Sequence, residues 1–267
     1  MIKFFRRIRQ KLLMDLPRRQ AGSKASKYLL YAIGEIILVV IGILIALQIN
    51  NWNEQRKERG REVEFLKGVK IDLLADKASL ENMIAERDAK VKGSIALLKT
   101  ENLNTYAEIF SADSTISTVH GWAEYVPQTN TFDELVSSGN LSIIKNDSIK
   151  SKLLKLKQLR EADHTYTEHM RREFDRYLYD RLAELGSVWP FGDFEKTVEQ
   201  WGFVRKDLSE EELREVGEGI KAYLNDRRVR NGLRLAAGNN HGLRMGCEKM
   251  YVEGNTLIEL IDEEINR

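Results

Sequence analysis

The chain has 267 residues, and a hydrophobic fraction of 42% excludes an intrinsically disordered protein, while only 3 prolines and 18 glycines exclude a low-complexity one. The net charge of +1 conceals an asymmetry, because residues 1–27 carry nine Lys or Arg and one Asp, whereas residues 50–267 carry 33 Lys or Arg and 39 Asp or Glu. A short basic end before an acidic body indicates a membrane rather than a nucleic acid as the partner. The single cysteine, Cys247, excludes an intramolecular disulfide and a metal site built from several cysteines.

Residues 1–27 are predicted to form a basic cytoplasmic segment. Its first 13 residues place apolar side chains at helical spacing with basic side chains among them, which predicts a short amphipathic helix suited to anionic lipid. The side chains expected at the membrane surface are Lys3, Arg6, Arg7, Arg9 and Lys11. These charges can also act only as a topology signal. Nucleic-acid binding is not expected, because the basic segment has neither a pattern of aromatic residues for base stacking nor a recognisable nucleic-acid-binding domain beside it.

Residues 28–49 form an apolar run that predicts a transmembrane helix of ~33 Å, enough to cross a hydrocarbon core of ~30 Å. A buried helix of a soluble core is one alternative, although the run is long for it. A cleaved signal peptide is another, but its apolar region has only about 7–15 residues and precedes a small-residue cleavage site. We therefore expect an uncleaved signal-anchor. The basic excess before it predicts a cytoplasmic N-terminus and residues 50–267 on the opposite side.

One face of this helix is predicted to pack against another helix. At 100° per residue, Tyr31, Glu35, Gly42 and Ala46 lie close to one line. Gly42 and Ala46 form a small-xxx-small pair, which lets two helices approach closely. An ionisable group such as Glu35 is costly inside a bilayer and is by default a functional hypothesis. The alternative is that Glu35 reaches the cytoplasmic headgroups, whereas a proton relay lacks a second acid or base in the span.

Residues 50–267 are predicted to form an elongated extracytoplasmic helical bundle, so the expected fold class is all-α. A helix is expected from residue 53 to about residue 100. Its predicted inward stripe consists of Leu66, Val69, Leu73, Leu80, Ile84, Val91, Ile95 and Leu98. Residues 101–130 are predicted to be a loop with short helical pieces. A short helix should follow from residue 131 and end at Gly139.

A long helix is expected from Asn146 or Asp147 to about residue 185, where Gly186 should end it. Its predicted inward side consists of Ile149, Leu153, Leu156, Leu159, Tyr166, Met170, Phe174 and Leu178. The aromatic turn that follows is a candidate docking patch or pocket, unless it only packs in the core, and its residues are Trp189, Phe191 and Phe194. A capping box, Ser209 to Glu212, should start another helix. The last helical stretch is expected to be interrupted near Gly238 and Gly242.

No motif appears in the context that catalysis requires, so we expect no enzyme activity, no cofactor and no metal. Glu161, His164 and Glu168 share a helix face, but a di-metal bundle needs a second Glu-x-x-His pair, so a solvated, charge-paired face is expected. Gly217 and Gly219 imitate part of a dinucleotide fingerprint. They follow a helical pattern rather than a strand, which predicts a bent or broken helix instead.

Two stretches resemble an uncharacterised family of single-pass membrane proteins from Bacteroidota. They are MIKFFRRIRQKLL with KYLLYAIGEIILVVIGILIALQINNWNE, and the later TFDELVSSGNLSIIKNDSIKSKLL, which together cover about a quarter of the chain. The resemblance implies the inner membrane of a Gram-negative cell and therefore a periplasmic body. It implies no site residue, because that family has no known function.

We therefore expect a membrane-anchored periplasmic scaffold that self-associates, as a homo-oligomer, or docks on an envelope complex through a membrane-protein partner. The alternative is a single-pass sensory or solute-binding module. Such a module would act through a partner, because about 27 cytoplasmic residues are too few for an output domain.

Overall fold

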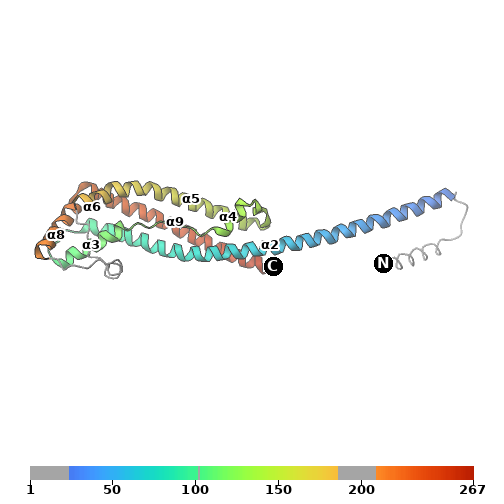
Figure 1. Ribbon diagram of the computed structural model, residues 1–267, viewed down its shortest axis with the longest axis horizontal. Coiled ribbons are helices and arrows are strands. Elements are labelled where there is room, and N and C mark those ends of the chain that lie inside the picture. Colours follow the sequence, from blue (N-terminus) through green and yellow to red (C-terminus); the bar gives the residue numbers. More distant parts are fainter. Residues whose placement is uncertain (1–23, 102, 186–208) are drawn as a thin grey trace. The chain divides into compact units, whose positions relative to one another are not determined.

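The computed structural model describes residues 24–101, 103–185 and 209–267, and these residues form helices and no strand (Figure 1). The all-α fold class is therefore confirmed. The chain divides into two compact units, Met1–Arg59 and Gly60–Arg267. The helices are α2 (Lys24–Lys99), α3 (Tyr106–His120), α4 (Asn130–Ser137), the 3-10 helix η1 (Asn140–Ile143), α5 (Asp147–Phe174), the π-helix η2 (Asp175–Tyr179), α6 (Asp180–Leu185), α8 (Glu210–Asn225) and α9 (Arg227–Ile265).

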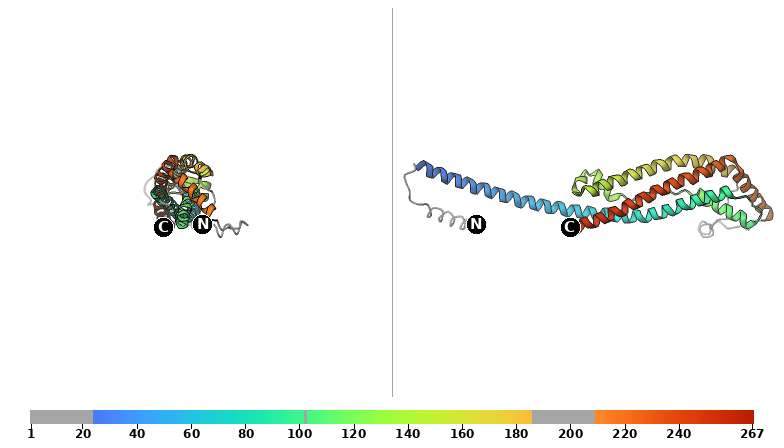
Figure 2. Two further views of the ribbon diagram at one scale, coloured as in Figure 1. Left: turned by 90° about the vertical axis from the view of Figure 1, so that its left-hand side faces the viewer. Right: turned by 180° about the vertical axis from the view of Figure 1, so that it is seen from behind.

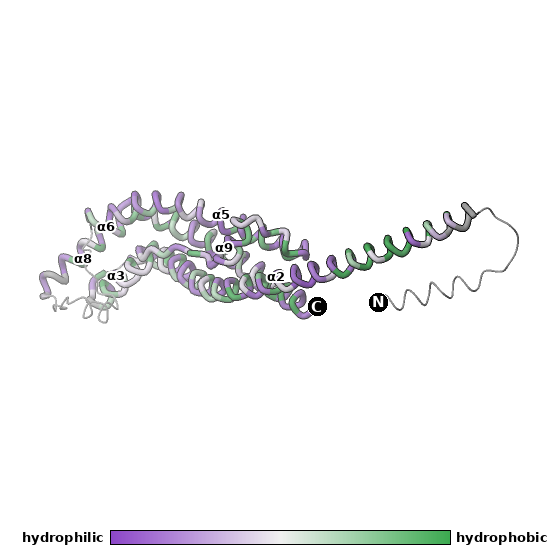
Figure 3. The backbone as a smooth tube through the Cα atoms, turned by 45° about the vertical axis from the view of Figure 1, so that its right-hand side comes forward, coloured by the Kyte–Doolittle hydropathy of each residue, from purple (hydrophilic) through white to green (hydrophobic). Residues whose placement is uncertain are grey.

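In the first unit, the described residues belong to the beginning of α2. No proline interrupts this helix, which can therefore keep its backbone hydrogen bonds along all of its 76 residues. Figure 3 shows a continuous hydrophobic stretch here, and none of its most apolar 18-residue window is buried. By length and composition, the helix is long and apolar enough to cross a membrane.

In the second unit, the continuation of α2 packs with α5 and α9, the other two long helices (Figure 2). Side chains on α2 pair with progressively earlier residues of α9. Lys70 Nζ lies 2.6 Å from Asp262, and Tyr251 donates a hydrogen bond of 2.8 Å to Glu81. These two helices are therefore antiparallel. Helix α5 is antiparallel to α9 as well, since Lys152 pairs with Glu253 and Tyr166 with Asn239.

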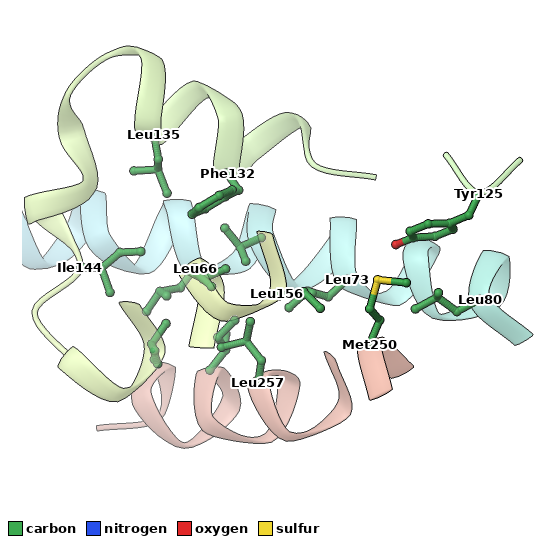
Figure 4. Close-up of a cluster of buried hydrophobic side chains, with 14 of the residues drawn as sticks. Leu66, Leu73, Leu80, Tyr125, Phe132, Leu135, Ile144, Leu156, Met250 and Leu257 are labelled. Carbon is green, nitrogen blue, oxygen red and sulfur yellow. The ribbon is translucent and has the colours of Figure 1, made fainter. Parts of the chain in front are cut away.

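Two apolar clusters stabilise the second unit. The first lies between α2, α4, α5 and α9, and Figure 4 shows Phe132 and Leu135 of α4 on the same cluster as Leu66 and Leu257. The second cluster joins the end of α2 to α3, α8 and the first turns of α9, with Tyr223 and Leu233 fully buried. Burying an aliphatic side chain contributes about 1.5–3 kcal/mol, so the clusters supply the main favourable term of folding.

Apart from Gly93, the buried positions of α2 and α5 follow a heptad spacing, with alternating steps of four and three residues. On α2 they are residues 62, 66, 69, 73, 76, 80, 83, 87, 90, 94 and 97, and on α5 they are residues 149, 153, 156, 160, 163, 167 and 170. This period of 3.5 residues is that of left-handed coiled coils. Helices α2 and α5 therefore keep a constant register along their buried faces.

The predicted inward stripe of α2 is correct as far as Leu80 and fails in the second half of the helix, and that of α5 fails at Tyr166. On α2, Ile95 is 41% exposed and Val91 is only partly buried; on α5, Tyr166 is 40% exposed. Ile84, Leu98, Leu159 and Phe174 are partly buried and pack against the two apolar clusters, as predicted. The error has a physical cause. The apolar residues lie on a face next to the buried one, whereas the buried positions keep the spacing of 3.5 residues. Polar side chains at those positions are therefore buried in the core.

Three expected interruptions of the helices are wrong. Residues 106–120 form one helix of 15 residues rather than short pieces, because Thr105 and Glu108 make a reciprocal capping box. Helix α8 continues through Gly217 and Gly219, and α9 continues through Gly238 and Gly242. A glycine costs a helix only about 1 kcal/mol relative to alanine, which tertiary packing readily offsets.

Other helix ends follow the sequence signals. Gly139 has φ 71° directly after α4, in the left-handed region where glycine is favoured. Asn146 caps α5, since its side-chain oxygen accepts hydrogen bonds from the backbone N–H groups of Ser148 and Ile149. Helices α5, η2 and α6 continue one another as far as Leu185, and α8 begins directly after Ser209. The expected stop at Gly186 lies outside the described residues.

Candidate functional site

The predicted packing face lies on the exposed beginning of α2. Tyr31 is 44% exposed, and Glu35 and Ala46 are also exposed. A Cβ atom built at Gly42 meets no atom within 4 Å. Within this unit, the face therefore offers a small-residue surface that a second helix can approach without steric hindrance.

Two other sets of predicted residues lie outside the described part of the chain. They are the membrane-surface residues Lys3, Arg6, Arg7, Arg9 and Lys11, and the aromatic residues Trp189, Phe191 and Phe194. Their roles stay predictions.

The metal-like trio of α5 lies at the surface, where Glu161, His164 and Glu168 are all exposed. His164 Nδ1 lies 3.1 Å from a carboxylate oxygen of Glu124 instead. Among the described residues, no group of three or more His, Cys, Asp or Glu is placed to hold a metal ion. His120 uses both ring nitrogens, one 2.8 Å from the carbonyl oxygen of Ile116 and the other 3.1 Å from the Tyr223 hydroxyl.

The sequence reasoning missed a set of buried polar side chains in the second unit. On each long helix they lie mainly between the residues of the first apolar cluster and those of the second. We call this set the buried polar section; it consists of Asp76, Arg87, Lys90 and Ser94 of α2, Arg160, Asp163 and Thr167 of α5, and Asn240 of α9. Charged side chains are rarely buried unless they are paired, so each of these positions calls for a partner.

One part of the buried polar section is an ion pair in which Arg160 Nη2 and the Asp76 carboxylate are partnered, although Arg160 Nε has no hydrogen-bond partner. Arg160 Nη2 lies 2.6 Å from Asp76 Oδ2, and the two side chains are 9% and 3% exposed. The Asp76 carboxylate also accepts hydrogen bonds of 2.7 Å from the Tyr125 hydroxyl and 3.2 Å from the backbone N–H of Gln128. Burial and the adjacent Asp76 charge raise the pKa of Tyr125 well above its usual range, which keeps the phenol a donor. The pair thus holds α2 and α5 in one register.

The other part contains two cations without a carboxylate partner. Arg87 is only 1% exposed and donates hydrogen bonds of 3.0 Å to Asn240 Oδ1 and to the carbonyl oxygen of Ala123. One turn later, Lys90 donates to the carbonyl oxygen of Gly121. Burial, and then the repulsion of Arg87, lower the pKa of Lys90 to about 8. Within the described part of the chain, neither cation forms an ion pair with a carboxylate.

Arg87 and Lys90 line a cavity of about 20 Å³, together with Trp122, Phe174 and residues of α9. Two of the lining residues carry buried donors without a hydrogen-bond partner, Arg87 Nε and Trp122 Nε1. The Trp122 ring packs against Phe174 at 5.5 Å between centroids, and the Arg171 guanidinium lies 5.7 Å from its centroid. The cavity is therefore rich in hydrogen-bond donors and positive charge.

The sequence does contain a signal for these buried polar residues. The four-and-three spacing set by Leu66, Leu73 and Leu80, continued unchanged along α2, reaches residues 87, 90, 94 and 97. Following apolar residues instead leads to Val91 and Ile95. Residue type alone thus selects the wrong face in the second half of the helix.

Fold and site together define an all-α protein with one helix long and apolar enough to cross a membrane, followed by a helical unit with a buried polar section. The chain belongs to DUF6090, a family of unknown function, whose model matches residues 35–197. The expected membership of an uncharacterised family is thereby confirmed, while an origin in Bacteroidota stays a prediction. No curated protein and no solved structure matches the chain.

Proposed function

We propose that this protein is a single-pass membrane-anchored interaction protein that self-associates, or docks on an envelope complex, through the face formed by Tyr31, Glu35, Gly42 and Ala46. Its N-terminus lies in the cytoplasm and its helical unit in the periplasm, with the inner membrane between them. The observation that carries the proposal is the exposure of an entire apolar stretch of α2, which a lipid bilayer would cover.

The physical case for association rests on two features that share this face. The Cβ position of Gly42 is open, so a second helix can approach closely and gain van der Waals contacts. The Glu35 carboxyl would face hydrocarbon in an isolated span, whereas a helix–helix interface can offer it hydrogen bonds. Lipid tails are as apolar as leucine, so close packing and polar contacts drive association in a membrane.

The alternative of a solute-binding sensory module finds less support. The cavity at Arg87 has a volume of about 20 Å³. A cavity of about 150 Å³ is needed to hold even a molecule as small as benzene. The described residues thus favour an interaction protein over a receptor for an organic solute at this place.

Native mass spectrometry of the full chain, gently extracted from its own membranes, tests the proposal. Gly42→Ile should abolish the homo-oligomer or the complex, because the new side chain holds the helices apart. Gly34→Ile is the matched control, since Gly34 has equally open space and lies about 90° around the helix from the centre of the face. An assembly that survives Gly42→Ile unchanged would refute packing at this face.

A thiol-labelling experiment tests the topology. Asn53→Cys should react with a membrane-impermeant maleimide in spheroplasts if the residues after the span are periplasmic. Wild type is the control, because Cys247 is buried and burial raises the pKa of its thiol to about 12, leaving almost no thiolate. Labelling of Asn53→Cys only after lysis would show that this end of the span is cytoplasmic and would contradict the proposed orientation.

A further inference from the structure

We propose that Arg87, Lys90 and Trp122 bind one small inorganic anion, of the size of chloride, in the cavity that they line. The site lies inside the helical unit and is independent of the membrane face discussed above. It gives the second unit a ligand that the sequence patterns do not predict.

The first argument is the supply of donors. Arg87 Nε and Trp122 Nε1 are buried without a partner, although buried donors are nearly always partnered. Lys90 Nζ has three protons and donates one hydrogen bond, to Gly121. All of these groups donate and none accepts, so the complementary ligand is a species that accepts several hydrogen bonds at once.

The second argument is charge. Arg87 and Lys90 lie one helical turn apart and repel each other, which contributes to the lowered pKa of Lys90. Glu173 also lines the cavity, but its carboxylate accepts a hydrogen bond of 2.9 Å from Asn239 and lies 3.4 Å from His169. Asp163 is near enough to Arg87 to oppose its charge, yet burial raises the pKa of this carboxyl. The carboxylates of Glu86 and Glu124 also offset part of the charge of Arg87, and Glu86 part of that of Lys90. An anion in the cavity would offset more of this charge, whereas a water molecule supplies only hydrogen-bond acceptors.

The third argument is size. A volume of about 20 Å³ holds one water molecule or one monoatomic ion. Phosphate esters and organic carboxylates are too large for it. The remaining wall includes the apolar side chains of Met170, Phe174 and Leu178, which offer the ligand no competing donor or acceptor. Chloride and bromide are therefore the suitable probes.

Thermal unfolding of the full chain in detergent tests the site. Chloride is titrated against gluconate, which cannot enter the cavity, at constant sodium concentration and pH 7. Chloride at ten times its dissociation constant should raise the midpoint by about 3–6 °C, and the rise should saturate. Equal midpoints in chloride and gluconate overturn the proposal and leave water as the occupant.

Two variants separate binding from general screening. Trp122→Phe removes the N–H donor, keeps an aromatic ring against Phe174, and should lose most of the chloride shift. Lys92→Met removes an exposed cation from the same helix and should keep the full shift, since the Lys92 side chain is 77% exposed. Equal loss in both variants would assign the effect to screening and refute the site.

Crystals of wild type soaked in bromide give a second measurement that does not depend on a variant folding. An anomalous peak within hydrogen-bond distance of Arg87 Nε and Trp122 Nε1 is the expected result. Peaks confined to the protein surface, with none in the cavity, would overturn the proposal.

Discussion

Breaking the buried ion pair between Asp76 and Arg160 should strongly destabilise the helical unit. Asp76→Asn keeps the size of the side chain and removes its charge, so the guanidinium of Arg160 stays buried, 9% exposed, with no counter-charge. Removing one partner of such a pair costs about 3–5 kcal/mol. The short separation of 2.6 Å and the further hydrogen bond from Tyr125 place this pair at the upper part of that range.

Removing both charges should cost less than removing one. The double variant Asp76→Leu with Arg160→Met replaces the pair by apolar side chains and abolishes the desolvation penalty of both charges. The Tyr125 hydroxyl loses its acceptor in this variant, so the free energy of unfolding should lie about 1–3 kcal/mol below wild type, a smaller loss than that of Asp76→Asn. The matched control is Asp88→Asn, which breaks an exposed ion pair of 2.5 Å with Lys92 on the same helix and should not change stability measurably.

Urea unfolding of the full chain in detergent, followed by circular dichroism at pH 7, measures these differences. A loss of about 4 kcal/mol corresponds to a thermal midpoint lower by roughly 8–16 °C for a domain of this size. The reasoning fails if Asp76→Asn unfolds within 1 kcal/mol of wild type. It also fails if the double variant is as unstable as the single one.

Two further predictions use the same unfolding assay. Between pH 8 and pH 10.5, the free energy of unfolding of wild type should rise by about 3 kcal/mol relative to that of Lys90→Met. The reason is that the buried Lys90 ammonium loses its proton at a lower pH in the folded state than in the unfolded chain. A difference between the two proteins that does not change with pH would contradict this. Gly232→Ala should cost about 1–3 kcal/mol, since the new Cβ would lie 2.8 Å from Tyr177 Cβ. At Gly238 a Cβ meets no atom within 4 Å, so Gly238→Ala should stabilise α9 by about 0.5–1 kcal/mol. Equal effects of the two substitutions would show that the packing at Gly232 is not tight.

Features that depend on one short segment could be predicted from the sequence. The apolar stretch of α2, the glycine that ends α4 and the asparagine that caps α5 lie where the residue pattern indicates them. Each depends on the composition or hydrogen bonding of a few consecutive residues. Knowledge of the partner helices adds nothing to such a prediction.

Features that depend on a partner helix could not be predicted in this way. The glycine at 217 does not break α8, because the space where its Cβ would lie is taken by Ile109 Cδ1, at 2.7 Å, which indicates close packing of α8 on α3. No local rule reports that contact. The continuity of this helix follows from the packing energy that an adjacent helix supplies.

By itself, the sequence determined that the protein is helical and that one helix is apolar enough for a membrane. Only the tertiary structure decided which side of α2 is buried after Met83, where Arg87 and Lys90 take core positions while Ile95 stays exposed. The reason is that hydrophobicity is a property of each side chain, whereas the burial of a side chain depends on how the helices are aligned with one another. A register set by the apolar ends of the bundle carries polar residues into its centre, and hydrogen bonds to Ala123, Gly121 and Asn240 make that burial tolerable.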